Sequence, residues 1–103
     1  MADAADPSTS SNPTGPTPAH RRATDRVDAI ADRLIEVSHR IHAHPELAYA
    51  EHHAHDLLCD ELEAATAGSA ALRVTRGAYG LDTAFEARVD GGAGPTVAII
   101  CEY

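Results

Sequence analysis

The sequence contains no lysine, and its eight arginines are outnumbered by sixteen acidic residues, which gives a formal net charge of −8 at pH 7. Proteins that bind nucleic acid through the phosphates need rows of basic side chains, and a negatively charged chain repels the polymer. We therefore expect no nucleic-acid partner. The complete absence of lysine indicates a biased codon composition rather than a chemical function.

Long apolar stretches are also missing. No run of residues is apolar enough for long enough to cross a bilayer, so the sequence predicts no membrane span. The first ten residues, M-A-D-A-A-D-P-S-T-S, are acidic where a secretory signal needs basic residues, and no apolar core follows them. We expect a soluble protein of the cytoplasm.

Cysteine is scarce, with only Cys59 and Cys101 in the chain. The two are far apart and each follows an apolar residue, so they do not form the framework of a disulfide-rich protein. We expect both to be reduced thiols inside the core.

A chain of 103 residues has room for one small domain at most, and its stability margin is thin. Residues 1–18 contain four of the six prolines together with Ser, Thr, Asn and Gly. Such a segment buries too little apolar surface to offset the conformational entropy that it would lose on folding. The sequence thus divides into a disordered Pro/Ser/Thr-rich tail at residues 1–23 and an incomplete domain at 24–103.

Two amphipathic helices are predicted after the tail. The first begins at Thr24 or Asp25, either of which is a plausible N-cap, and apolar residues then recur at steps of three and four as far as Ile41. Pro45 disfavours helical geometry at the residue before it and separates the two helices. The second helix carries its apolar stripe from Ala50 to Ala65, with Gly68 as a credible C-terminal cap.

Three strands are predicted next, at residues 72–76, 83–89 and 96–103. The middle strand alternates, with Phe85 and Val89 on one side and Glu86 on the other, as a half-exposed strand does. The D-G-G-A-G link before Pro95 suits an antiparallel hairpin between the second and third strands.

The third strand is a continuous apolar run, Val97–Cys101, which is typical of a strand covered on both faces. Such a strand is normally central in its sheet, yet the sequence stops at Tyr103 without a further helix to cover it. We therefore expect the chain to be the first part of a larger α/β domain, whose chemistry begins near the end of this strand.

Six of the seven histidines cluster around Pro45, at His39, His42, His44, His52, His53 and His55. Zinc needs three or four converging ligands, and helical spacing supplies only pairs here, without an H-E-x-x-H or C-x-x-C motif. We interpret these histidines as surface and helix-end residues, and assign no metal ligand.

The other candidate groups also have ordinary structural interpretations. Glu46 and Glu51 could form an acid/base pair, but carboxylates in such a connector more often favour the N-terminus of the next helix. The glycines at 91, 92 and 94 precede a strand rather than a helix and are turn residues. Ser38 and Ser69 lack a nucleophile-elbow context. We assign no catalytic and no cofactor-binding residue.

Three sequence motifs together resemble a known family: H-R-I-H-A-H-P-E-L-A-Y-A-E-H, Y-G-L-D-T-A-F-E-A and G-P-T-V-A-I-I-C-E-Y. In this order and at these distances they resemble the N-terminal portion of the M-twenty peptidases, and the aminobenzoyl-glutamate hydrolase-like group in particular. The similarity covers roughly residues 25–103. Its most specific parts match Arg40–His52 and Cys101–Tyr103.

The resemblance implies a zinc-exopeptidase-like α/β/α catalytic domain with an inserted lid domain that often dimerises the protein. It also implies hydrolysis of an amide bond in N-acyl amino acids or aminobenzoyl-glutamate-like substrates by water activated on zinc or manganese, with a Glu as general base. In the family, the metal ligands follow the point at which this sequence ends. The resemblance therefore implies a truncated, inactive fragment. A small stand-alone His-rich module that binds a metal or a partner is the alternative.

Overall fold

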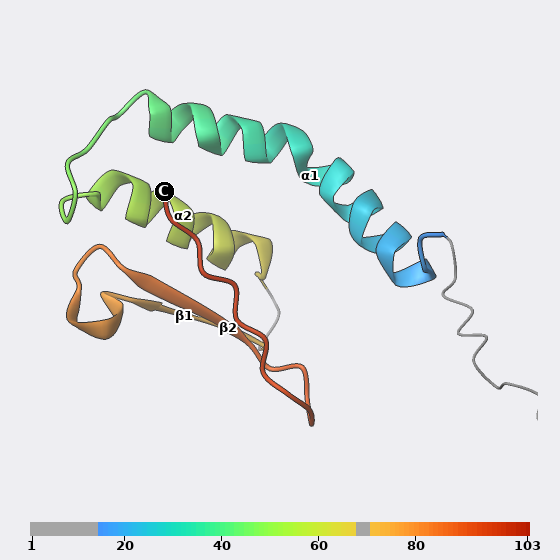
Figure 1. Cartoon of the computed structure of the whole chain (residues 1–103). Helices are drawn as coiled ribbons and strands as arrows, with labels where there is room; N and C mark the ends of the chain where they lie inside the picture. Colours follow the sequence, from blue (N-terminus) through green and yellow to red (C-terminus); the bar gives the residue numbers. More distant parts are fainter. Residues whose placement is uncertain (1–14, 68–70) are drawn as a thin grey trace, which may run out of the picture. The chain divides into compact units, whose positions relative to one another are not determined.

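A computed structural model describes residues 15–67 and 71–103, and it shows a mixed α/β chain (Figure 1). The elements follow the order α1 (Pro18–His42), α2 (His52–Ala65), β1 (Leu72–Arg76), a 3-10 turn η1 (Ala78–Gly80) and β2 (Phe85–Val89). The chain divides into two compact units, one ending at Arg33 and the other beginning at Leu34. None of the described helices could span a membrane.

Helix α1 begins earlier than the sequence analysis predicted. Its first residue is Pro18 rather than one close to Thr24, so residues 18–23, which we assigned to the tail, are helical. The Thr17 hydroxyl accepts a hydrogen bond from the His20 amide at 3.2 Å, which caps the helix, and proline is favoured at the first helical position. The rest of the predicted disordered tail, residues 1–14, lies outside the described residues.

The break at Pro45 and the second helix are confirmed. Helix α1 ends at His42, and α2 runs from His52 to Ala65, close to the predicted limits. Its buried residues are Ala54, His55, Leu57 and Cys59; Ala54 and Leu57 lie three positions apart and His55 and Cys59 four, as expected for one face of a helix. The predicted cap at Gly68 lies outside the described residues.

The sheet has two strands, and its hairpin is not the one that we predicted. Strands β1 and β2 pair antiparallel, with Leu72 opposite Val89 and Arg76 opposite Phe85. The connection between them contains η1 and three residues with positive φ, Gly77, Tyr79 and Gly80. Helix α2 packs along this hairpin (Figure 1), so the small core lies between them and is lined by the buried residues of α2 together with Ala78 and Thr83.

The predicted third strand does not form in the structure. Residues 90–103 are extended but pair with neither strand, and Val97, Ile99 and Ile100 are 84%, 86% and 94% exposed. An apolar run gains stability as a buried strand only where another layer covers each of its faces. The exposure of these side chains shows that the described elements do not supply this cover.

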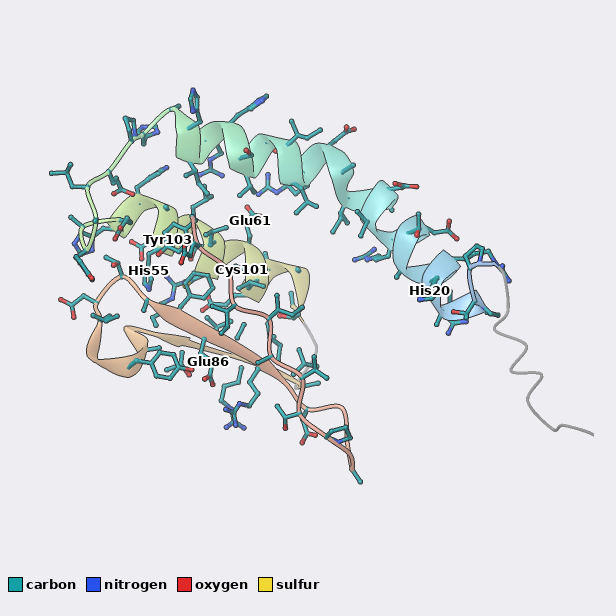
Figure 2. The ribbon with its side chains drawn as sticks, viewed as in Figure 1. His20, His55, Glu61, Glu86, Cys101 and Tyr103 are labelled. Carbon is teal, nitrogen blue, oxygen red and sulfur yellow. The ribbon has the colours of Figure 1, made fainter. Side chains whose placement is uncertain are left out.

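Cys101 lies in this exposed segment, so our prediction that both cysteines are core thiols is correct only for Cys59. The segment is nevertheless tethered at Tyr103. The hydroxyl of Tyr103, which is labelled in Figure 2, donates a hydrogen bond to the Thr83 carbonyl oxygen at 2.5 Å, and the ring stacks on Phe85 with centroids 6.2 Å apart.

Candidate functional site

The connector between α1 and α2 places a carboxylate at the N-terminus of α2. The two carboxylate oxygens of Glu46 accept hydrogen bonds from the backbone amides of His53 and Ala54, at 2.7 and 3.0 Å. These amides belong to the first helical turn, where no intrahelical acceptor is available. The two bonds hold the pKa of Glu46 below its usual value. The predicted helix-end role of Glu46 is confirmed.

Glu51, the residue just before α2, joins the helix to the β1–β2 connection. Its carboxylate accepts a hydrogen bond from the Thr83 hydroxyl at 3.0 Å. The pKa of Glu51 is also lowered, first by its own backbone amide and then by Thr83. A carboxyl group that acts as a general acid near neutral pH needs a raised pKa, which neither residue has. Both carboxylates are therefore held ionised, as structural acceptors.

The clustered histidines do not converge. His39, His42, His44 and His52 are exposed, whereas His55 is buried. The ring centroids of His44 and His53 lie 4.4 Å apart, and the buried His53 Nε2 atom has no hydrogen-bond partner among the residues that the structure describes. Across residues 15–67 and 71–103, no three His, Cys, Asp or Glu side chains are arranged so that they could hold a metal ion.

One arrangement of reactive groups was not anticipated. His55 lies between Asp56, whose Oδ1 is 2.9 Å from the His55 Nδ1, and Cys59, whose Sγ is 3.9 Å from the His55 Nε2. The ring of His55, which is labelled in Figure 2, also packs edge-on against Phe85. The i,i+4 spacing of His55 and Cys59 on a helix was the available signal in the sequence.

This Cys–His–Asp order is that of a nucleophile, a base and an orienting carboxylate, but the setting is unsuitable for catalysis. Cys59 is 0% exposed, so a substrate has no access to its sulfur. Burial also raises the pKa of the thiol, which keeps it protonated and unreactive. The group is a packed part of the core.

Two hollows lie beside these residues, within the unit that begins at Leu34. The larger, of about 450 Å³, is mainly apolar, and its lining residues are Leu34, Val37, Ser38, Ile41, His42, Leu58 and Tyr103. The smaller, of about 100 Å³, lies along the connector and is lined in part by Glu46 and Glu51. Ser38 lies within α1 rather than at a strand-to-helix turn, as the absence of a nucleophile elbow predicted.

The remaining sequence candidates are not part of a site. Gly92 and Gly94 have positive φ, and the Gly92 amide donates a hydrogen bond to the Asp90 carboxylate, so both are turn residues, as predicted. Ser69 lies outside the described residues. Arg76 is a structural group that the sequence analysis missed: it contacts Asp56, Asp60 and Glu63 on α2 at 3.4, 2.6 and 3.2 Å.

Comparison with known proteins adds one relationship. No protein-family profile and no solved structure gives a significant match. Among curated proteins, the chain is similar to an Xaa-Arg dipeptidase of Mus musculus, with 42% identity over 89 residues. The aligned region is 81% of this chain but 20% of the dipeptidase, so the chain spans about one fifth of that relative. The match relates this chain to a peptidase.

Proposed function

We propose that this chain is the N-terminal part of the catalytic domain of a metal-dependent amidohydrolase, and that it is inactive by itself. The observation that carries this proposal is the alignment with a dipeptidase, which takes in 81% of the chain and only 20% of the relative. Most residues of the dipeptidase therefore lie outside the aligned region. The ligands of a catalytic metal come from several elements of a fold, and this chain supplies only the first of those elements.

The exposed apolar segment supports the same proposal. Val97–Cys101 has the composition of an interior strand, yet its large side chains are exposed to solvent. Further strands and helices of a larger α/β domain would cover both faces of this run. In that setting the segment would become the third strand that its sequence predicts.

The reaction that we propose for the longer polypeptide is the cleavage of an amide bond. A bound zinc or manganese ion would supply a polarised water molecule for the attack. The described residues of this chain do not fit such an ion, because no three potential ligands converge. We therefore assign no catalytic step to these residues, and propose that they have a structural role in the domain.

The substrate class that we propose is an N-acyl amino acid, an aminobenzoyl-glutamate-like amide or a dipeptide. The name of the mouse relative favours a dipeptide with a C-terminal arginine. A cytoplasmic location and a homodimer for the longer enzyme are further parts of the proposal. The alternative of a stand-alone His-rich metal-binding module has no supporting arrangement of ligands among the described residues.

The test compares two purified polypeptides. One is the 103-residue chain, and the other is the product of the reading frame extended through the nucleotide sequence downstream of Tyr103. Each is incubated with dipeptides ending in Arg, Lys or Glu and with aminobenzoyl-glutamate, with zinc or manganese added, and with and without a chelator. We expect metal-dependent hydrolysis by the extended polypeptide alone.

Two results would overturn the proposal. The first is chelator-sensitive hydrolysis by the 103-residue chain, because its site would then be complete. The second is a downstream sequence that, in all frames, shows no further resemblance to the M-twenty peptidases, whose metal ligands lie in that part of the chain. Calorimetric titration of the 103-residue chain with zinc tests the alternative, which requires saturable binding that is lost when His52 and His55 are both changed to alanine.

A further inference from the structure

The N-terminal half of α1 carries an apolar stripe that is largely exposed. Its residues recur at alternating steps of four and three, the spacing of a helix that packs lengthwise against a second helix: Ala23, Val27, Ile30 and Leu34. Val27 is 54% exposed and Leu34 is 51% exposed. The same spacing continues to Val37, which is buried within the unit that begins at Leu34. The exposed part of the stripe therefore precedes a part that is already packed.

The charged side chains of α1 are sorted around this stripe. With about 3.6 residues per turn, Arg26 and Arg33 lie on one flank, about 70–90° from the centre of the stripe, and both are exposed. The other flank is uncharged and holds Thr24 and Ala31. The carboxylates lie about 130° or more from the centre, on the far side of the helix: Asp25, Asp28, Asp32 and Glu36. The charge that borders the stripe is thus positive.

We propose that residues 23–34 of α1 form a docking surface for an amphipathic helix of a partner protein, whose own apolar stripe is flanked by glutamate or aspartate. Charged residues that flank the contact between two packed helices set the choice of partner. In this arrangement Arg26 and Arg33 each meet a carboxylate, and Val27 lies between the two helices. The inference rests on α1 alone and does not depend on the proposed function.

The same charges disfavour a second copy of this chain as the occupant. In an antiparallel pair of α1 helices the two arginine flanks would face each other, and in a parallel pair each would face the uncharged flank. Neither arrangement brings a carboxylate to Arg26 or Arg33. The net charge of −8 on each copy opposes association further. A helix with acidic flanks gains attraction at both arginines, so charge complementarity selects a different molecule.

The length of the stripe limits the strength of binding. Residues 23–34 make about three helical turns, which is a short contact between helices. Exposed ion pairs contribute little each and are screened by salt. We expect a Kd of about 10–100 μM at about 50 mM salt, and binding that is several-fold weaker at about 500 mM.

Two synthetic peptides of about 28 residues serve as probes. Both have leucine and isoleucine along a heptad seam, and the flanking positions are all glutamate in one peptide and all lysine in the other, so that neither pairs with itself. Fluorescence anisotropy of each labelled peptide is measured as the 103-residue chain is added. We expect the glutamate peptide to bind, and the lysine peptide to bind at least about tenfold more weakly.

Two pairs of variants locate the surface. Arg26→Glu should weaken binding of the glutamate peptide about fivefold, because attraction becomes repulsion, whereas Arg21→Glu makes the same change on the far side of α1 and should bind like the parent. Val27→Asp should abolish binding, whereas Ile35→Asp should not. Ile35 is 53% exposed, almost as much as Val27, but lies about 110° from the centre of the stripe. Circular dichroism checks that each variant keeps its helices.

Several outcomes would overturn the inference. Failure of the glutamate peptide to bind, or equal affinities for both peptides, removes the proposed partner chemistry. Binding that survives Val27→Asp uses another surface. The extended polypeptide is titrated in the same way. If it hydrolyses amides but does not bind the glutamate peptide, its later residues cover the stripe, and this inference fails while the proposed function stands. Binding by an extended polypeptide that hydrolyses no amide gives the reverse result.

Discussion

The Glu51 carboxylate accepts a hydrogen bond from the Thr83 hydroxyl, 32 positions further along the chain. This bond connects the start of α2 with the segment that precedes β2. We expect Thr83→Val to lower the free energy of unfolding by about 1 kcal/mol, because the Glu51 carboxylate loses the hydrogen bond donated by this buried hydroxyl. The pKa of Glu51 should rise towards its usual value. Thermal unfolding and the NMR titration of Glu51 measure the two effects.

Thr66→Val is the control for this change. The Thr66 hydroxyl donates a hydrogen bond to the Leu62 carbonyl oxygen within the same helix, so it connects no distant segments. An equal loss of stability in both variants would contradict a connecting role for Thr83.

Acid should lower the stability of the folded chain, because Glu46 becomes protonated. Its pKa is lowered by the amides of His53 and Ala54, so the folded chain favours the ionised carboxylate. The resulting stability is fully present above the unfolded pKa, about 4.3, and is lost as the pH falls through the lower folded value. We expect Glu46→Gln to be less stable than the parent at neutral pH and to lose less stability on acidification. Urea unfolding at about pH 7 and about pH 3 tests this difference.

Asp25→Asn provides a matched change of one carboxylate on the exposed surface of α1. It should leave the acid dependence of unfolding unchanged. If Asp25→Asn reduces the pH dependence of the unfolding free energy as much as Glu46→Gln does, the hydrogen bonds that Glu46 accepts at the start of α2 do not explain that dependence.

Arg76 should contribute a salt-sensitive part of the stability. Its guanidinium contacts three carboxylates on α2, and its pKa is raised by the hydrogen bonds to Asp60 and then Glu63. The carboxylates are more than half exposed, so water screens the attraction strongly. We expect Arg76→Gln to lower the Tm by no more than a few degrees, and the difference to vanish in about 1 M sodium chloride.

Arg76→Lys separates charge from geometry, because lysine keeps the charge but cannot contact several carboxylates with one planar group. Its Tm should lie between those of the parent and Arg76→Gln. Arg73→Gln on the same strand is the control. A difference that persists at high salt would indicate a packing role for the Arg76 side chain.

Burial should determine the cost of removing a leucine. Leu57 is 5% exposed and Leu47 is 82% exposed. We expect Leu57→Ala to lower the free energy of unfolding by about 2 kcal/mol, because it leaves a cavity between α2 and the hairpin. Leu47→Ala should change it by less than about 0.5 kcal/mol. Urea unfolding of the two variants checks the contrast, and equal losses would contradict the core described here.

The parts of the fold that depend on local patterns could be predicted from the sequence. Apolar residues at helical spacing located both helices, and Pro45 marked the break between them because its effect on the preceding residue is steric. The predicted start of α1 was wrong because the apolar residues at helical spacing begin later in the sequence than the helix does. The Thr17 cap and Pro18 extend the helix beyond that stripe.

The parts that depend on distant partners could not be predicted in this way. Val97–Cys101 has the pattern of a buried strand, but burial requires a covering layer, which the described residues do not supply. The contact of Glu51 with Thr83 depends on how α2 meets the hairpin, and no spacing rule encodes it. Glu46 was predictable, because a carboxylate ahead of a helix start has a general electrostatic advantage.

The two cysteines differ in exposure as completely as two side chains can, since Cys59 is fully buried and Cys101 lies in the open segment. A thiol reagent will therefore modify one position at once and the other only when α2 separates from the hairpin. The ratio of the two labelling rates measures how often the core opens in the absence of denaturant. The chain thus carries, in its two natural cysteines, both the site that reports local unfolding and the reference for it.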